Sequence, residues 1–101
     1  MKKIRILFTA LWGEEITYSL FEVRTRVRNQ DKLIKLIDET DEMLVDDCLA
    51  GFQGQYPHNI LGYLKSKKHI CSYEFICRST FKAVGSDEFS VSGVDVFYEM
   101  R

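Results

Sequence analysis

The residues best suited to chemistry are six carboxylates between positions 38 and 47, in the stretch DETDEMLVDD. Carboxylates grouped in this way can bind a metal ion or present negative charge to a basic partner. A calcium loop of the EF-hand type needs a central glycine and ligands at alternate positions. The run has no glycine and is apolar at positions 43–45. A catalytic two-metal site draws its carboxylates from several elements, so the sequence predicts no metal site here.

A helix over residues 31–50 would position these carboxylates. Asn29 or Asp31 is suited to cap its start, and Gly51 follows its end. At a helical spacing of about 100° per residue, four apolar residues gather on one side. These are Leu33, Ile37, Leu44 and Cys48. The predicted outer face consists of Asp38, Glu39, Glu42 and Asp46.

Two carboxylates of the run do not fit that outer face. Asp41 and Asp47 lie at the margins of the apolar side. One explanation is a helix break near Thr40, which would place Asp41 in the first turn of a second helix, where the helix dipole stabilises negative charge. The other is that both aspartates meet cations at the edge of the core.

A second feature is a run of arginines in a predicted strand over residues 16–28. Arg24, Arg26 and Arg28 alternate with apolar residues, so they would lie on one face about 7 Å apart. Lys3 and Arg5, on the preceding strand, could join them. This spacing suits nucleic-acid phosphates. Against it, the net charge of −1 and the pI of about 6.1 are not those of a strongly basic domain, and exposed arginines also protect strands from aggregation.

Charge is segregated along the chain. Residues 1–35 carry about +4, residues 36–56 about −6, residues 57–82 about +4 and residues 83–101 about −3. Such blocks either pair with one another in the fold or produce a dipolar surface that steers a particular partner.

Support for catalysis is weak. The sequence has no Gly-rich phosphate loop, nucleophile elbow or His–Glu metal motif. His58, beside Asn59 and Tyr56, gives a third hypothesis, an acid–base site of a small hydrolase or nuclease. Cys71, Phe75 and Cys77 would share the inward face of one strand. The two cysteines would lie about 20 Å apart along it, too far for a disulfide. The cysteine and histidine spacing also fails to match a zinc site, so we expect free thiols, no enzyme, no metal and no cofactor.

The alternation of apolar and polar residues predicts the architecture. Strands are expected over residues 3–11, 16–28, 69–84 and 89–100, and helices over 31–50 and 57–67. The result is a single α+β domain over residues 1–101, with a four-stranded, mainly antiparallel sheet in ββ-α(α)-ββ order and helices on one face. That element order is analogous to a β-grasp arrangement. No stretch approaches the roughly 20 apolar residues of a membrane span.

These observations favour a small cytoplasmic protein that binds a protein partner without catalysis. The acidic helix would dock on a basic surface, with Phe52 and Tyr56 as neighbouring aromatic anchors. Small size and segregated charge are typical of inhibitors, immunity proteins and phage anti-defence proteins. The first alternative is nucleic-acid binding by the arginine strand, and an open sheet face would instead favour a homodimer.

Overall fold

The computed structural model of the 101-residue chain describes residues 2–12, 15–46, 57–82 and 93–100. Its elements follow the predicted order, and the α+β class is confirmed. They are β1 (Lys2–Trp12), β2 (Glu15–Thr25), α1 (Gln30–Asp46), α2 (His58–Ser66), β3 (Ile70–Lys82) and β4 (Val96–Glu99). Within these ranges, no helix is long and apolar enough to cross a membrane.

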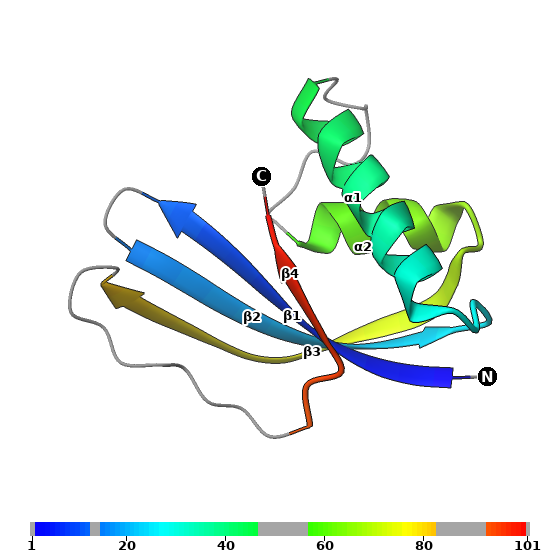
Figure 1. Cartoon of the computed structure of the whole chain (residues 1–101), viewed down its shortest axis with the longest axis horizontal. Helices are drawn as coiled ribbons and strands as arrows, with labels where there is room; N and C mark the ends of the chain where they lie inside the picture. Colours follow the sequence, from blue (N-terminus) through cyan, green and yellow to red (C-terminus); the bar gives the residue numbers. More distant parts are fainter. Residues whose placement is uncertain (1, 13–14, 47–56, 83–92, 101) are drawn as a thin grey trace.

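The four strands form one open, mixed sheet in the order β3-β2-β1-β4. β1 pairs antiparallel with β2 and β2 with β3, whereas β4 runs parallel to β1. Both helices lie on one face of this sheet, as Figure 1 shows. They cover the end that contains the start of β1 and the start of β3, and the three long strands extend beyond them.

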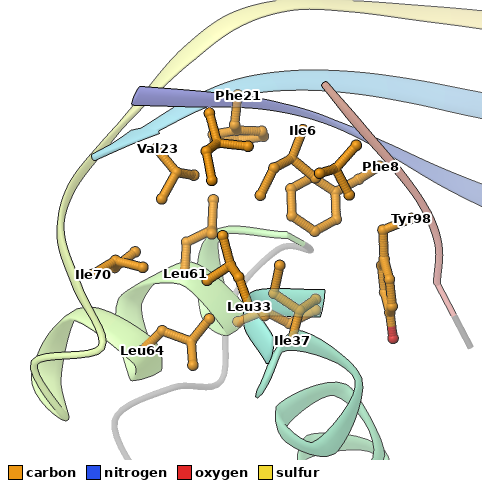
Figure 2. Close-up of a cluster of buried hydrophobic side chains, with 13 residues drawn as sticks. Ile6, Phe8, Phe21, Val23, Leu33, Ile37, Leu61, Leu64, Ile70 and Tyr98 are labelled. Carbon is orange, nitrogen blue, oxygen red and sulfur yellow. The ribbon is translucent and has the colours of Figure 1, made fainter. Parts of the chain in front are cut away.

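The core lies between the helices and this face of the sheet. Alternate residues of β1 and β2 point into it because side chains alternate faces along a strand. Figure 2 shows them meeting the apolar sides of α1 and α2. The fully buried members are Ile4, Ile6, Phe8, Phe21, Val23, Leu33, Ile37, Ile60 and Leu61. Phe8 and Phe21 meet edge to face, with ring centroids 5.9 Å apart.

Helix α1 is continuous across Thr40, so the structure shows no break there. Asn29 caps the helix, since its Oδ1 accepts a hydrogen bond of 2.9 Å from the backbone N–H of Asp31. The Thr40 hydroxyl donates a hydrogen bond of 2.7 Å to the backbone carbonyl of Leu36. Thr40 therefore makes its hydrogen bond within the helix and does not cap a second one.

Asp41 points inward and meets a tyrosine of β4. Its side chain is fully buried, and its Oδ2 accepts a hydrogen bond of 2.9 Å from the Tyr98 hydroxyl. Asp38 Oδ1 lies 3.2 Å from the same hydroxyl. Burial, together with the nearby carboxylates of Asp41 and Asp38, raises the pKa of Tyr98 well above its usual range. The two aspartates thus tie α1 to the edge of the sheet.

Strand β3 differs from its predicted pattern because its register with β2 shifts in two places. Phe75 pairs with Phe21, but Cys77 pairs with Leu20, which leaves Ile76 as the extra residue. The bulge moves Cys77 to the opposite face of the sheet from Phe75. The prediction that Phe75 and Cys77 share one inward face is therefore wrong.

The last strand is shorter than predicted within the described part of the chain. It covers only Val96–Glu99, and residues 83–92 lie outside the described ranges. Gly93 lies in the turn before this strand, and its φ of 80° explains the need for glycine there.

Candidate functional site

The candidate site begins where β2 ends. The buried Thr25 hydroxyl donates to the backbone carbonyl of His69 at 2.9 Å and accepts a 3.0 Å hydrogen bond from the backbone N–H of Val27. These bonds hold the chain in a turn after Thr25. Arg26 and Arg28 therefore lie beyond the strand, and the prediction that they continue one strand face with Arg24 is wrong.

Two surface hollows meet at Arg26. The larger, of about 550 Å³, is lined by Lys2, Thr25, Arg26 and Arg28. In the smaller hollow, of about 300 Å³, Arg26 joins Lys65 and Lys68. Ile70 and Cys71 complete its lining. Among the described residues, every charged side chain that lines these two hollows is a cation. We call these five residues the basic cluster: Lys2, Arg26, Arg28, Lys65 and Lys68.

Separate parts of the chain supply the basic cluster. Lys2 begins β1, Lys65 lies in the last turn of α2, and Lys68 lies in the turn before β3. All five side chains are exposed. The Nζ of Lys2 lies 3.5 Å from the backbone carbonyl of Arg28, so a backbone oxygen helps to hold two cations close together. Such an arrangement attracts a multivalent anion.

Lys68 occupies a conformation that favours glycine. Its φ is 62°, and the chain around it forms a Schellman motif at the end of α2. The N–H of Lys68 donates to the carbonyl of Lys65 at 3.0 Å, and that of His69 donates to Leu64 at 3.0 Å. A side chain in this left-handed region costs about 1 kcal/mol. The chain thus has a cation at a position where glycine would be more stable.

Replacing Lys68 by Gly should therefore stabilise the fold and weaken anion binding. We expect the free energy of unfolding to rise by about 0.5–1 kcal/mol, because glycine relieves the strain of the positive φ. The greater conformational entropy of glycine in the unfolded chain offsets part of this gain. Affinity for a nucleic acid should fall about five- to eightfold at about 0.1 M salt, the effect of one lost phosphate contact. Urea unfolding and binding titrations measure the two effects. Lys67→Gly is the matched control, because Lys67 has a φ of −90° and lies outside both hollows.

The other cations of the arginine hypothesis lie on the face of the sheet opposite the helices. Lys3 pairs with Arg24 and Arg5 with Glu22 across β1 and β2. Nε of Arg5 lies 3.5 Å from a Glu22 carboxylate oxygen, and Nζ of Lys3 lies 4.0 Å from the other. This surface is of mixed charge, unlike the basic cluster.

The predicted acidic surface is reduced by the fold. Asp38 is half-buried beside Tyr98 rather than on the outer face of α1. Glu39 and Glu42 are exposed as predicted. Asp46 ends α1, but its side chain lies outside the described part, as do the predicted aromatic anchors Phe52 and Tyr56.

His58 lies among aromatic rings. Its ring centroid is 5.1 Å from that of Phe21, 6.2 Å from Tyr73 and 6.5 Å from Phe75. Among the described residues no hydrogen bond of the imidazole occurs, and Tyr56 of the hydrolase hypothesis lies outside them. No group of three potential metal ligands occurs in the same ranges.

Apolar residues pair across three strands on the face of the sheet opposite the helices. Leu7 pairs with both Leu20 and Phe97. Leu7 and Leu20 are buried, whereas Phe97 is 68% exposed. A homodimer through this face remains a prediction.

Sequence reasoning found Arg26 and Arg28 but missed their neighbours. The positive charge of residues 57–82 was the sequence feature that indicated Lys65 and Lys68. For Lys2 it was the positive charge of residues 1–35. Comparison with protein-family models, with curated proteins and with solved structures gave no match. The function must therefore be argued from this geometry.

Proposed function

We propose that this protein binds nucleic acid through the basic cluster. The observation that carries the proposal is the position of Arg26. It is shared by two hollows whose charged lining residues, within the part of the chain that the structure describes, are all cations. Cations from distant parts of the chain repel one another when they are gathered in this way. A bound polyanion would relieve that repulsion.

Nucleic acid suits this site better than a single small anion. The five cations are spread over two adjoining hollows, so they can contact several phosphates along a strand. Arginine can contact a phosphate with two parallel N–H groups, and lysine acts as a point charge. The net charge of −1 does not oppose this proposal, because the carboxylates of residues 38–47 balance the cations along the sequence.

A salt titration tests the proposal. The logarithm of the binding constant should fall with the logarithm of salt concentration, with a slope of about −3 to −4 for a single strand if all five cations contact phosphates. Fluorescence anisotropy of a labelled oligonucleotide of about 16 nucleotides, between about 50 and 200 mM salt, measures this slope. Absence of binding at the lowest salt, or a slope near zero, would contradict the proposal.

A second candidate function is protein binding by the outer face of α1, in the cytoplasm. The observation favouring it is that the charges of α1 oppose its dipole. The C-terminal end of a helix favours cations, yet α1 has none in its last turn and carries exposed Glu39 and Glu42 in its second half. Carboxylates in this half of the helix gain no stabilisation from its dipole, and a basic partner would give them a role.

Site-directed crosslinking tests this second candidate. With a photo-reactive amino acid in place of Glu42, we expect one basic host protein to be crosslinked, because the outer face of α1 would lie in the interface. The matched control places the same group at Lys35, which is exposed on the first half of the helix. An identical crosslinking pattern from both positions, or none from Glu42, would eliminate this candidate.

A further inference from the structure

An aromatic surface lies at the outer edge of the sheet, between β3 and the start of α2. It is formed by His58, Tyr73 and Phe75, and we call it the aromatic edge. His58 is exposed, Tyr73 is half-buried and Phe75 is 46% exposed. The buried Phe21 supports them, with its ring centroid 5.1 Å from that of His58 and 5.5 Å from that of Phe75. Rings held in this way present aromatic surface to solvent with little freedom to move.

The two elements that carry the aromatic edge, α2 and β3, also lead to Lys65 and Lys68 of the basic cluster. His58 begins α2 and Lys65 lies in its last turn, a separation of about 10 Å along the helix. On β3, Phe75 lies about 13 Å from Cys71, which lines the smaller hollow beside Lys68. A short nucleic-acid strand can therefore reach both surfaces.

We propose that the bound nucleic acid is single-stranded and that its bases stack on the aromatic edge while its phosphates contact the basic cluster. This inference rests on the proposed function. Proteins that bind single strands combine a cationic surface with aromatic side chains, because every base offers a flat face for stacking. In a duplex those faces are already stacked on one another, so the aromatic edge would gain nothing from it.

Phe75 lies on the edge strand β3, directly before its bulge. An exposed aromatic residue on an edge strand promotes aggregation, and proteins normally place charged residues on such strands to prevent it. A protein contact would also cover this surface. Nucleotide bases suit this surface better than an apolar protein surface does. Cations lie nearby, and one of the three rings is the polar imidazole of His58.

The test compares three ligands of about 16 nucleotides with the native protein: a single strand, the corresponding duplex and an abasic strand with the same phosphate backbone. Stacking of one base predicts that the single strand binds about five- to hundredfold more tightly than the abasic strand. Equal affinity for these two ligands would overturn this inference and leave the proposed function intact. Failure to bind any of the three would overturn both.

Two variants place the effect at the aromatic edge. Phe75→Leu keeps an apolar side chain against Phe21 but removes the ring, and should lower affinity for the single strand at least about fivefold, with affinity for the abasic strand unchanged. His58→Gln should also lower affinity for the single strand and leave affinity for the abasic strand unchanged. It replaces Phe75→Leu in the test if that variant unfolds. Phe97→Leu is the matched control, because Phe97 is an exposed phenylalanine on the other edge strand. If Phe75→Leu and His58→Gln both bind the single strand like the control, the inference is overturned.

Discussion

Replacing Tyr98 by Phe should lower the free energy of unfolding at neutral pH by about 1–3 kcal/mol, the cost of removing a hydrogen-bond donor from a buried polar group. The Tyr98 hydroxyl donates to the fully buried Asp41 at 2.9 Å, and the substitution removes this donor while keeping the ring that packs on Phe8. Figure 2 shows Tyr98 at the margin of the core, beside α1. Urea unfolding measures the loss.

The same variant should also lose part of the protein's sensitivity to alkali. The pKa of Tyr98 is raised in the folded state by burial and by the two carboxylates, whereas an unfolded tyrosine titrates near pH 10. Its contribution is thus fully present below about pH 10 and declines by about 1.4 kcal/mol per pH unit above it. Stability of the variant should fall less steeply over that range.

Tyr73→Phe provides the control for both measurements. Tyr73 is half-buried and contacts Phe21 and His58 through its ring. Its replacement should change the free energy of unfolding by less than about 0.5 kcal/mol. If Tyr98→Phe is as stable as this control at neutral pH, the contact with Asp41 does not hold α1 to the sheet.

The sequence predicted the elements well because their signals are local. Alternation along the first strand places Ile4, Ile6 and Phe8 in the core, where the structure has them. The cap at Asn29 and the helix start after Pro57 depend on single residues and their neighbours. The antiparallel hairpin of β1 and β2 follows from proximity along the chain.

The sequence could not predict contacts between distant residues. Asp41 stood out as a misfit on α1, but its partner Tyr98 lies 57 residues further along the chain. Nothing local distinguishes a tyrosine partner from the cationic partner that we expected. The bulge at Ile76 also lacks a local signal such as glycine, so the sequence placed Cys77 on the wrong face of the sheet.

The candidate site was predicted only in part for the same reason. The alternation of Arg24, Arg26 and Arg28 indicated one strand face, yet the hydroxyl of Thr25 bonds to the backbone at His69 and ends the strand. The fold then brings Lys65 and Lys68 to Arg26 from the other side. A cluster made from the ends of several elements can be recognised only once the sheet order is known.

Arg26→Glu should have the largest effect on nucleic-acid binding of any single substitution. Arg26 is the residue that both hollows share, so reversing its charge removes one phosphate contact and adds repulsion at the centre of the basic cluster. Each of these two changes is worth about five- to eightfold at about 0.1 M salt, which gives a combined loss of about 25- to 60-fold. Stability should change by less than about 0.5 kcal/mol because the side chain is exposed.

Lys35→Glu supplies the matched control for that experiment. It changes the net charge by the same amount at an exposed position of α1, and Lys35 lines neither of the two hollows. A general effect of net charge would weaken binding equally in both variants. An effect of the basic cluster would weaken it mainly in Arg26→Glu.

The most direct test of nucleic-acid binding by the basic cluster is the dissociation constant of a labelled single strand, measured side by side for the native protein, Arg26→Glu and Lys35→Glu. We predict that Arg26→Glu raises this constant by about 25- to 60-fold and that Lys35→Glu raises it by less than about eightfold. Equal dissociation constants for the two variants, or no binding by the native protein, would contradict the proposed function.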